Sequence, residues 1–64
     1  MPKLSLVISV YNEEKNVVPL TEKIAESLKG LDYEVIYVDD GSTDSTVQNI
    51  LSIKDPHVVL IRFK

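Results

Sequence analysis

Residues 34–46 read EVIYVDDGSTDST, an apolar run that stops at two adjacent carboxylates, turns at a glycine and continues toward a helix. β-Branched and aromatic side chains pack well on a pleated surface, so residues 35–38 predict a short buried strand. Gly41 permits a backbone conformation that a Cβ would resist. Asp39 and Asp40 therefore follow the strand at its carboxyl end, where ligands bind in open α/β sheets. The alternative is that one carboxylate caps the turn and the other is solvated.

The remaining elements follow from hydrophobic periodicity. Alternation over residues 4–10 predicts a first strand, and residues 58–63 predict a third. Apolar spacings of three and four predict a helix that begins after Asn16, its N-cap, and ends near Gly30. A second, shorter helix is expected over residues 44–53. The apolar residues expected on the inner faces of the two helices are Val17, Leu20, Ile24, Leu28, Leu31, Val47, Ile50 and Leu51.

The order β-α-β-α-β predicts an α/β fold with a three-stranded parallel sheet in the order 3-2-1. Crossover connections between parallel strands are right-handed in nearly all cases, so both helices are expected on one face of the sheet. All three strands carry apolar residues on both sides, which is typical of a sheet that is covered on both faces. We therefore expect residues 1–64 to be part of a larger α/β domain, and the isolated chain to self-associate.

Composition excludes several classes of protein. The chain has 64 residues, enough for one small domain, and it contains no cysteine for a disulfide or a thiolate metal site. A net charge of −3 without a basic cluster argues against a nucleic-acid partner. The longest apolar runs are far too short for a membrane span or a signal peptide, so a cytoplasmic location is expected. The single histidine, His57, cannot form a zinc site alone and is expected to be a solvated loop residue.

Two motifs together resemble a known family. They are VISVYNEE at residues 7–14 and VDDGSTD at residues 38–44. The pair resembles the start of the family 2 inverting glycosyltransferases, which have the Rossmann-like GT-A fold, and within them it is most similar to the dolichyl- or polyprenyl-phosphate sugar synthases. The resemblance covers all 64 residues. It implies that residues 1–64 are the amino-terminal, nucleotide-binding portion of a glycosyltransferase catalytic domain, about a quarter of a usual one.

The resemblance also implies a set of nucleotide-binding residues. In the family, the loop after the first strand and the acidic turn after the second hold the nucleoside of a sugar nucleotide. Tyr11 offers a ring on which a base can stack, and Asp40 can accept a hydrogen bond from a base imino N–H. Asp39 has an alternative role, since it could bond backbone groups of the Tyr11 loop without touching the ligand. The family more often has proline or threonine at Ser9. The residues that match the family's nucleotide site are Ser9, Tyr11, Glu13, Asp39 and Asp40.

The implied reaction is sugar transfer from a UDP- or GDP-linked donor to an acceptor, for which a polyprenyl phosphate is a candidate. A divalent metal, Mg²⁺ or Mn²⁺, is expected in the full-length parent at a later D-x-D motif. Neither that motif nor the general base of the family has a counterpart in these 64 residues. The chain alone is therefore expected to bind no metal and to be inactive. The parent is a candidate for association with the cytoplasmic face of a membrane.

Other functional classes fit the sequence less well. Two glycines in total are too few for a dinucleotide-binding fingerprint or a phosphate-binding P-loop. A phosphoacceptor receiver domain would carry its acidic pair after the first strand and another aspartate after the third, whereas here the third strand ends in Arg62 and Phe63. A non-catalytic interaction or assembly module, using the bare face of the sheet, is the more serious alternative.

Overall fold

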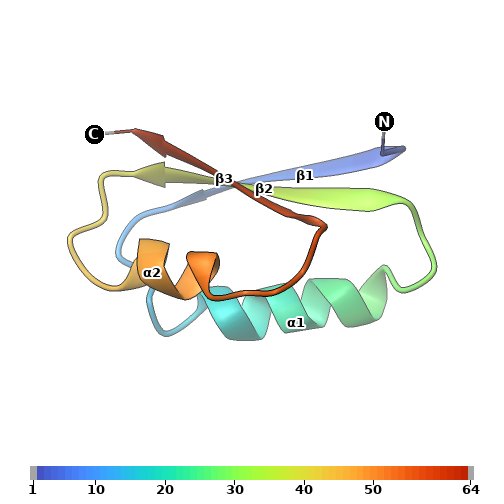
Figure 1. Cartoon of the computed structure of the whole chain (residues 1–64), viewed down its shortest axis with the longest axis horizontal. Helices are drawn as coiled ribbons and strands as arrows, with labels where there is room; N and C mark the ends of the chain where they lie inside the picture. Colours follow the sequence, from blue (N-terminus) through green and yellow to red (C-terminus); the bar gives the residue numbers. More distant parts are fainter. Residues whose placement is uncertain (1, 64) are drawn as a thin grey trace.

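The computed structural model describes residues 2–63. It contains the five expected elements in the expected order. They are β1 (Leu4–Val10), α1 (Val17–Ser27), β2 (Tyr33–Asp40), α2 (Thr46–Leu51) and β3 (Val58–Phe63). Both helices lie against one face of the sheet (Figure 1). The predicted α/β fold is confirmed.

The sheet is fully parallel, with β2 between β1 and β3. The predicted order 3-2-1 is therefore correct. Val10 pairs with Asp39, and Asp39 pairs with Arg62, so the carboxyl ends of all three strands meet at one edge. This carboxyl edge carries the loop after β1 and the acidic turn. β2 is longer than the predicted strand at 35–38, so Asp39 and Asp40 are its last two residues rather than the residues that follow it.

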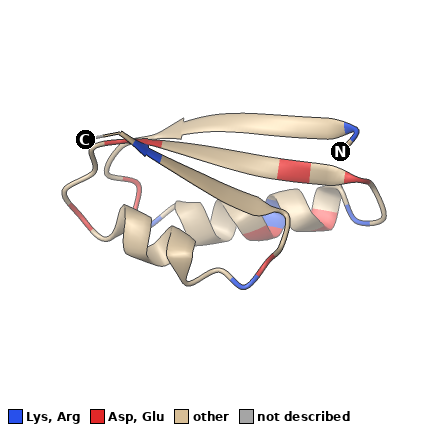
Figure 2. Cartoon of the chain, turned by 45° about the horizontal axis from the view of Figure 1, so that its top comes forward, with Lys and Arg blue, Asp and Glu red and all other residues tan. Residues whose placement is uncertain are grey.

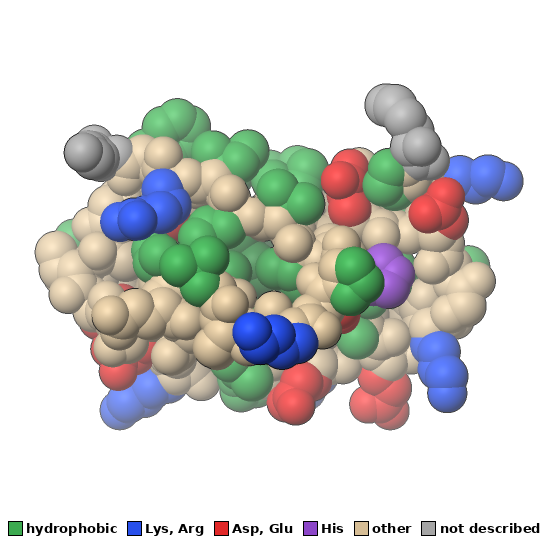
Figure 3. All heavy atoms as spheres, viewed as in Figure 1, with side chains coloured by type: hydrophobic (Ala, Val, Ile, Leu, Met, Phe, Trp, Pro, Cys, Tyr) green, Lys and Arg blue, Asp and Glu red, His purple; other side chains and the backbone are tan. Residues whose placement is uncertain are grey.

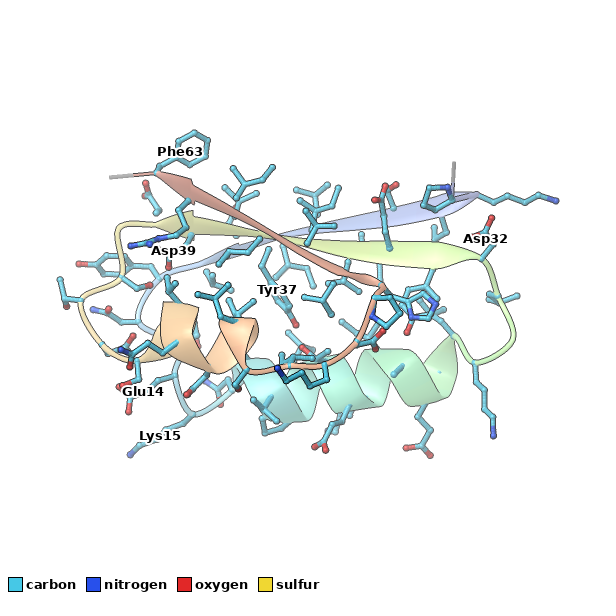
Figure 4. All side chains as sticks on the ribbon, viewed as in Figure 1. Glu14, Lys15, Asp32, Tyr37, Asp39 and Phe63 are labelled. Atoms are coloured by element: carbon cyan, nitrogen blue, oxygen red, sulfur yellow. The ribbon has the colours of Figure 1, made fainter. Side chains whose placement is uncertain are left out.

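The core lies between the sheet and the helices and is centred on Tyr37. Its side chain is 0% exposed and points from β2 toward α1 (Figure 4). Its hydroxyl shares a hydrogen bond with the hydroxyl of Thr21, so the buried polar atom of each residue has a partner. The buried hydrophobic residues are Val10, Val17, Tyr33, Val35, Tyr37, Val47 and Ile50.

The prediction that Leu20, Leu31 and Leu51 face the core is wrong. Leu20 is 37% exposed, because the inner stripe of α1 passes through Thr21, which packs at 5% exposure and bonds Tyr37. Leu51 is 63% exposed at the last position of α2, and Leu31 lies beyond the end of α1 and is also exposed. A polar residue that pairs inside the core cannot be found from hydrophobic spacing alone.

The helices are also shorter than expected. Asn16 is the N-cap of α1 as predicted, but its side chain donates to Glu13 rather than capping the helix. α1 ends at Ser27, and Gly30 follows in the left-handed region at φ 86°. α2 begins at Thr46 instead of residue 44, because the two residues before it are hydrogen-bonded to the loop after β1.

Among the described residues 2–63, no helix covers the second face of the sheet (Figure 1). Val7 is 66% exposed and Phe63 is 56% exposed on this side, where Figure 4 shows Phe63 pointing away from the helices. Val59 and Ile61 are exposed as well. Apolar side chains accordingly gather along the sheet side of the molecule (Figure 3). We refer to these residues, Val7, Val59, Ile61 and Phe63, as the uncovered face.

His57 lies in the loop before β3, as expected, but its ring is not free in solvent. The ring stacks on that of Tyr33 with their centroids 4.1 Å apart, and Nδ1 lies 2.6 Å from Oδ1 of Asp55. The same oxygen accepts the backbone N–H of His57. That backbone hydrogen bond, together with the imidazole, lowers the pKa of Asp55 below its ordinary value of 3.8, and partial burial opposes the shift.

Acid should therefore weaken the fold through Asp55. A carboxyl whose pKa is lower in the folded state contributes stability that is present above its unfolded value near 3.8 and is lost as the pH falls through the folded value. We expect the free energy of unfolding to fall between pH 5 and pH 2, with about 0.2–1 kcal/mol of the change due to this partly exposed pair. Urea titrations at several pH values measure it. Asp55→Asn should flatten the profile and Glu26→Gln, on the outer face of α1, should not; identical profiles for the two variants would contradict this role.

Candidate nucleotide-binding site

Asp39 is a buried residue at the end of β2 that holds the acidic turn by hydrogen bonds. Its side chain is 2% exposed and points from the end of β2 toward the helix side (Figure 4). Oδ2 accepts the backbone N–H groups of Gly41 (3.2 Å) and Ser42 (3.1 Å), and Oδ1 accepts the Ser42 hydroxyl. Gly41 has φ 86°, the left-handed conformation predicted for it. Both oxygens of Asp39 are thus engaged by its own turn.

Asn12 joins the loop after β1 to this turn. Its backbone N–H donates to Ser42 Oγ at 2.9 Å, and its side-chain Oδ1 accepts the N–H of Thr43 at 2.8 Å. Asn12 also has φ 53°, a conformation that asparagine tolerates better than most residues. Through the Ser42 hydroxyl, Asp39 is connected to the Tyr11 loop indirectly, rather than by the direct backbone bond considered as its alternative role.

A second link lies deeper, at the start of α2. Thr46 is fully buried, and its hydroxyl accepts the N–H of Glu13 at 2.7 Å while donating to Asp44. The Glu14 carboxylate accepts the N–H of Ser45. Partial burial acts to raise the pKa of Asp44, but hydrogen bonds from Thr46 and Glu14 outweigh it and hold the pKa below 3.8. The two loops therefore form one hydrogen-bonded unit at the carboxyl edge.

The predicted site residues occupy different parts of this unit. Asp40 is exposed at the end of β2, and Tyr11, 57% exposed, follows directly after the strand residue that pairs with Asp39. Neighbouring strands lie about 4.8 Å apart, so Tyr11 and Asp40 leave the sheet side by side. Ser9, in β1, and Glu13, in the loop after β1, line a hollow of about 180 Å³ beside the start of α1. That hollow does not include the other three predicted residues.

The charge at this edge is mainly negative. Figure 2 shows acidic segments at the end of β2 and in the loops beside it, with one basic segment near the end of β3. Within residues 2–63, no group of three or more Asp, Glu or His side chains is placed to hold a metal ion. The donor set of this part of the chain therefore does not fit a divalent cation.

Sequence reasoning missed three residues that build the unit. Asn12, Ser42 and Thr46 hold the two loops together, although none was singled out as a site residue. The asparagine at the end of a strand was a usable signal, since this residue type is enriched at positive φ. The pairing of Thr46 with Glu13 spans 33 positions and has no local signature.

Comparison with known proteins agrees with this architecture. The family model described as Glycosyl transferase family 2 matches residues 5–64. The chain is 44% identical over 64 residues to undecaprenyl-phosphate 4-deoxy-4-formamido-L-arabinose transferase of Proteus mirabilis, covering 92% of this chain and 20% of that protein. It is 42% identical to dolichol-phosphate mannosyltransferase of Pyrococcus furiosus, covering 97% of this chain and 18% of that protein.

A third relative is dodecaprenyl-phosphate galacturonate synthase of Rhizobium johnstonii, 47% identical over 49 residues that cover 73% of this chain and 14% of that protein. A parallel α/β unit with paired loops at its carboxyl edge is typical of nucleotide-binding domains. The chain belongs to glycosyl transferase family 2. It spans about a fifth of the length of these relatives.

Among residues 2–63, neither helix has the length and apolarity needed to cross a bilayer.

Proposed function

We propose that residues 1–64 are the amino-terminal, nucleoside-binding portion of a glycosyltransferase that uses a UDP- or GDP-linked sugar. The observation that carries the proposal is the hydrogen-bonded contact between the two loops. Asn12 and Thr46 hold the segment after β1 against the acidic turn. This contact holds together the segments that carry Tyr11 and Asp40, two exposed residues at the carboxyl ends of neighbouring strands. Tyr11 would stack on the base and Asp40 would accept its imino N–H.

The roles of the other three predicted residues differ. Asp39 would not contact the nucleotide; its hydrogen bonds would fix the conformation of the acidic turn next to Asp40. Ser9 and Glu13 would border the site from the side of β1, where they share a hollow. Ser9 lies where the family more often has proline or threonine, so we assign it no direct contact with the base.

Three relatives are named for polyprenyl- or dolichol-phosphate products or substrates, which supports a polyprenyl phosphate as the acceptor. Such an acceptor is already an anionic nucleophile and needs no general base to deprotonate it. A divalent metal, when bound, would stabilise the leaving diphosphate. Residues 2–63 do not fit this ion, so we place its ligands in the remainder of a full-length parent, meaning a protein of the relatives' length that carries these residues. An acceptor of this kind would place the parent at the cytoplasmic face of a membrane.

A transfer assay with the full-length parent tests this function. Labelled sugar should pass from the UDP- or GDP-linked donor to a polyprenyl phosphate in detergent, and chelation of divalent metal should stop the transfer. The 64-residue chain should show no transfer under the same conditions. Absence of any glycosylated lipid with either donor class would contradict the proposed reaction. A parent that binds neither nucleotide would favour the interaction-module alternative.

We also predict that the isolated 64-residue chain self-associates through the uncovered face. Burial of about 400 Å² of apolar surface is worth about 10 kcal/mol before association entropy is subtracted. Sedimentation velocity at rising concentration measures the effect. Val7→Lys should shift the chain toward monomer, whereas Leu51→Lys, an equally exposed residue on α2, should not. Compact monomers of the unmodified chain at high concentration would contradict the prediction.

A further inference from the structure

Asp40 lies beside Phe63 at the carboxyl edge, on the same side of the sheet as the uncovered face. Side chains alternate along a strand, and Asp39 is buried on the helix side, so Asp40 points away from the helices. Phe63 is the register partner of Asp40 on β3, and residues paired across parallel strands share a face. Figure 4 shows the Phe63 ring on the side away from the helices. The Cα atoms of the two residues are therefore about 4.8 Å apart, the spacing of neighbouring strands.

The neighbours of this pair on the same face are apolar. Ile61 lies two residues before Phe63 on β3, and its register partner Val38 lies two residues before Asp40 on β2. The next pair back along the two strands is Ile36 with Val59. Among these six residues Asp40 is the one polar side chain. This corner of the sheet therefore combines a single hydrogen-bond acceptor with an apolar, aromatic surface.

Such a corner suits a flat ring that carries an N–H on its edge. An ionised carboxylate accepts hydrogen bonds and donates none, so Asp40 can pair only with a donor of the ligand. The Phe63 ring offers an apolar face on which a planar ring can stack. Uracil and guanine are planar and carry an imino N–H on the ring edge.

The spacing of the two strands agrees with stacking. Paired aromatic rings have their centroids about 4.5–7 Å apart. A base whose N–H reaches Asp40 lies over β2, one strand spacing of about 4.8 Å from β3 and from the Phe63 ring. A base held by Asp40 is therefore on the side of the sheet where Phe63 lies and within stacking distance of it.

We propose that Phe63 is a second base-stacking residue, which packs against the base whose imino N–H Asp40 accepts. This inference rests on the proposed nucleotide-binding function and extends the site to β3. Tyr11 follows β1, on the other side of β2, so the base would have an aromatic residue on either side of Asp40. Phe63 would contribute affinity for a planar base, and Asp40 would supply the preference for a base with an imino N–H.

Calorimetry on the full-length parent tests this role with the preferred nucleoside, uridine or guanosine, and with its diphosphate. Phe63→Ala removes the ring and should weaken both ligands by the same factor, about tenfold, because stacking on an aromatic side chain contributes affinity of this order. Phe63→Tyr keeps a ring and should retain the affinity. Phe63→Leu keeps apolar bulk without a ring and should lose most of what Phe63→Ala loses. Val59→Ala is the matched control, since it shortens an exposed side chain four residues earlier on the same face, and it should change neither affinity.

Three results would overturn the assignment while leaving nucleotide binding intact. Unchanged nucleoside affinity in a folded Phe63→Ala protein would mean that the ring does not touch the base. Full affinity in Phe63→Leu would mean that the position supplies apolar bulk rather than stacking. Equal losses for Phe63→Ala and Val59→Ala would mean that this face packs against the remainder of the parent.

Two further outcomes are distinguishable from these. If Phe63→Ala does not fold, the comparison of Phe63→Tyr with Phe63→Leu decides the same question, and equal affinities of these two variants would overturn the stacking role. If the unmodified parent binds neither the nucleosides nor their diphosphates, the proposed function itself fails, and the role of Phe63 fails with it.

Discussion

Asp39→Ala is expected to destabilise the 64-residue chain by about 2–4 kcal/mol, a large part of the stability of a domain this small. The substitution removes the acceptor for the N–H groups of Gly41 and Ser42 and for the Ser42 hydroxyl. A buried donor left without a partner costs about 1–3 kcal/mol, and partial access of water to the turn lowers the sum. Asp39→Asn keeps one acceptor and should cost about 1 kcal/mol.

Urea unfolding followed by circular dichroism measures these differences, at a concentration where sedimentation shows a single species. The neighbouring carboxylate is the matched control, because Asp40 is exposed and has no hydrogen-bonding role in the turn among residues 2–63. Asp40→Ala should change the free energy of unfolding by less than about 0.5 kcal/mol. Equal losses for Asp39→Ala and Asp40→Ala would show that the buried carboxylate does not organise the turn.

Asp40→Asn should have the opposite profile, with little effect on folding and a large effect on binding. In the full-length parent it replaces a charged acceptor by a neutral amide, which should weaken sugar-nucleotide binding by about 1.5–3 kcal/mol if the bound base shields the contact from water. Tyr11→Ala should weaken binding through the loss of stacking, by about 1–3 kcal/mol. Calorimetric titration with UDP and GDP sugars gives both values.

Glu22→Gln provides the control for Asp40→Asn, since it neutralises an exposed carboxylate on α1, away from the carboxyl edge. Its affinity should match that of the unmodified protein. Equal affinities for Asp40→Asn and Glu22→Gln would mean that the acidic turn is structural and that the nucleotide binds elsewhere.

The fold could be predicted because local pattern and general topology point the same way. The apolar run before Asp39 and the alternation in β1 specify strands, and right-handed crossovers then leave few arrangements of five elements. Leu31 and Leu51 are exposed because the helices end before or at them, and two other errors come from pairing between residues distant in sequence. Thr21 replaces Leu20 in the core because it bonds Tyr37, and the ring of His57, just before β3, stacks on Tyr33 of the neighbouring strand β2.

The candidate site was predictable to a smaller extent. The acidic turn was identified from its place at a strand end, which general rules for α/β sheets single out, whereas Tyr11 was identified through the resemblance to family 2 glycosyltransferases. The sequence left open which of Asp39 and Asp40 is structural and which is free to bind a ligand. Side chains alternate between the two faces of a strand, but the sequence alone does not show which face the helices cover. The hydrogen bonds of Asn12 and Thr46 depend on how the two loops meet, and local sequence does not encode that contact.

Hydrogen–deuterium exchange in the full-length parent, with and without UDP or GDP, tests nucleoside binding at the carboxyl edge most directly. A base held between Tyr11 and Asp40 predicts slower exchange in peptides that contain residues 11–14 and 39–44, with unchanged exchange over the outer face of α1. The protection should disappear in Asp40→Asn at the same nucleotide concentration. Nucleotide-dependent protection that leaves both loops unchanged and appears in other parts of the protein would contradict the assignment of this edge as the nucleoside site.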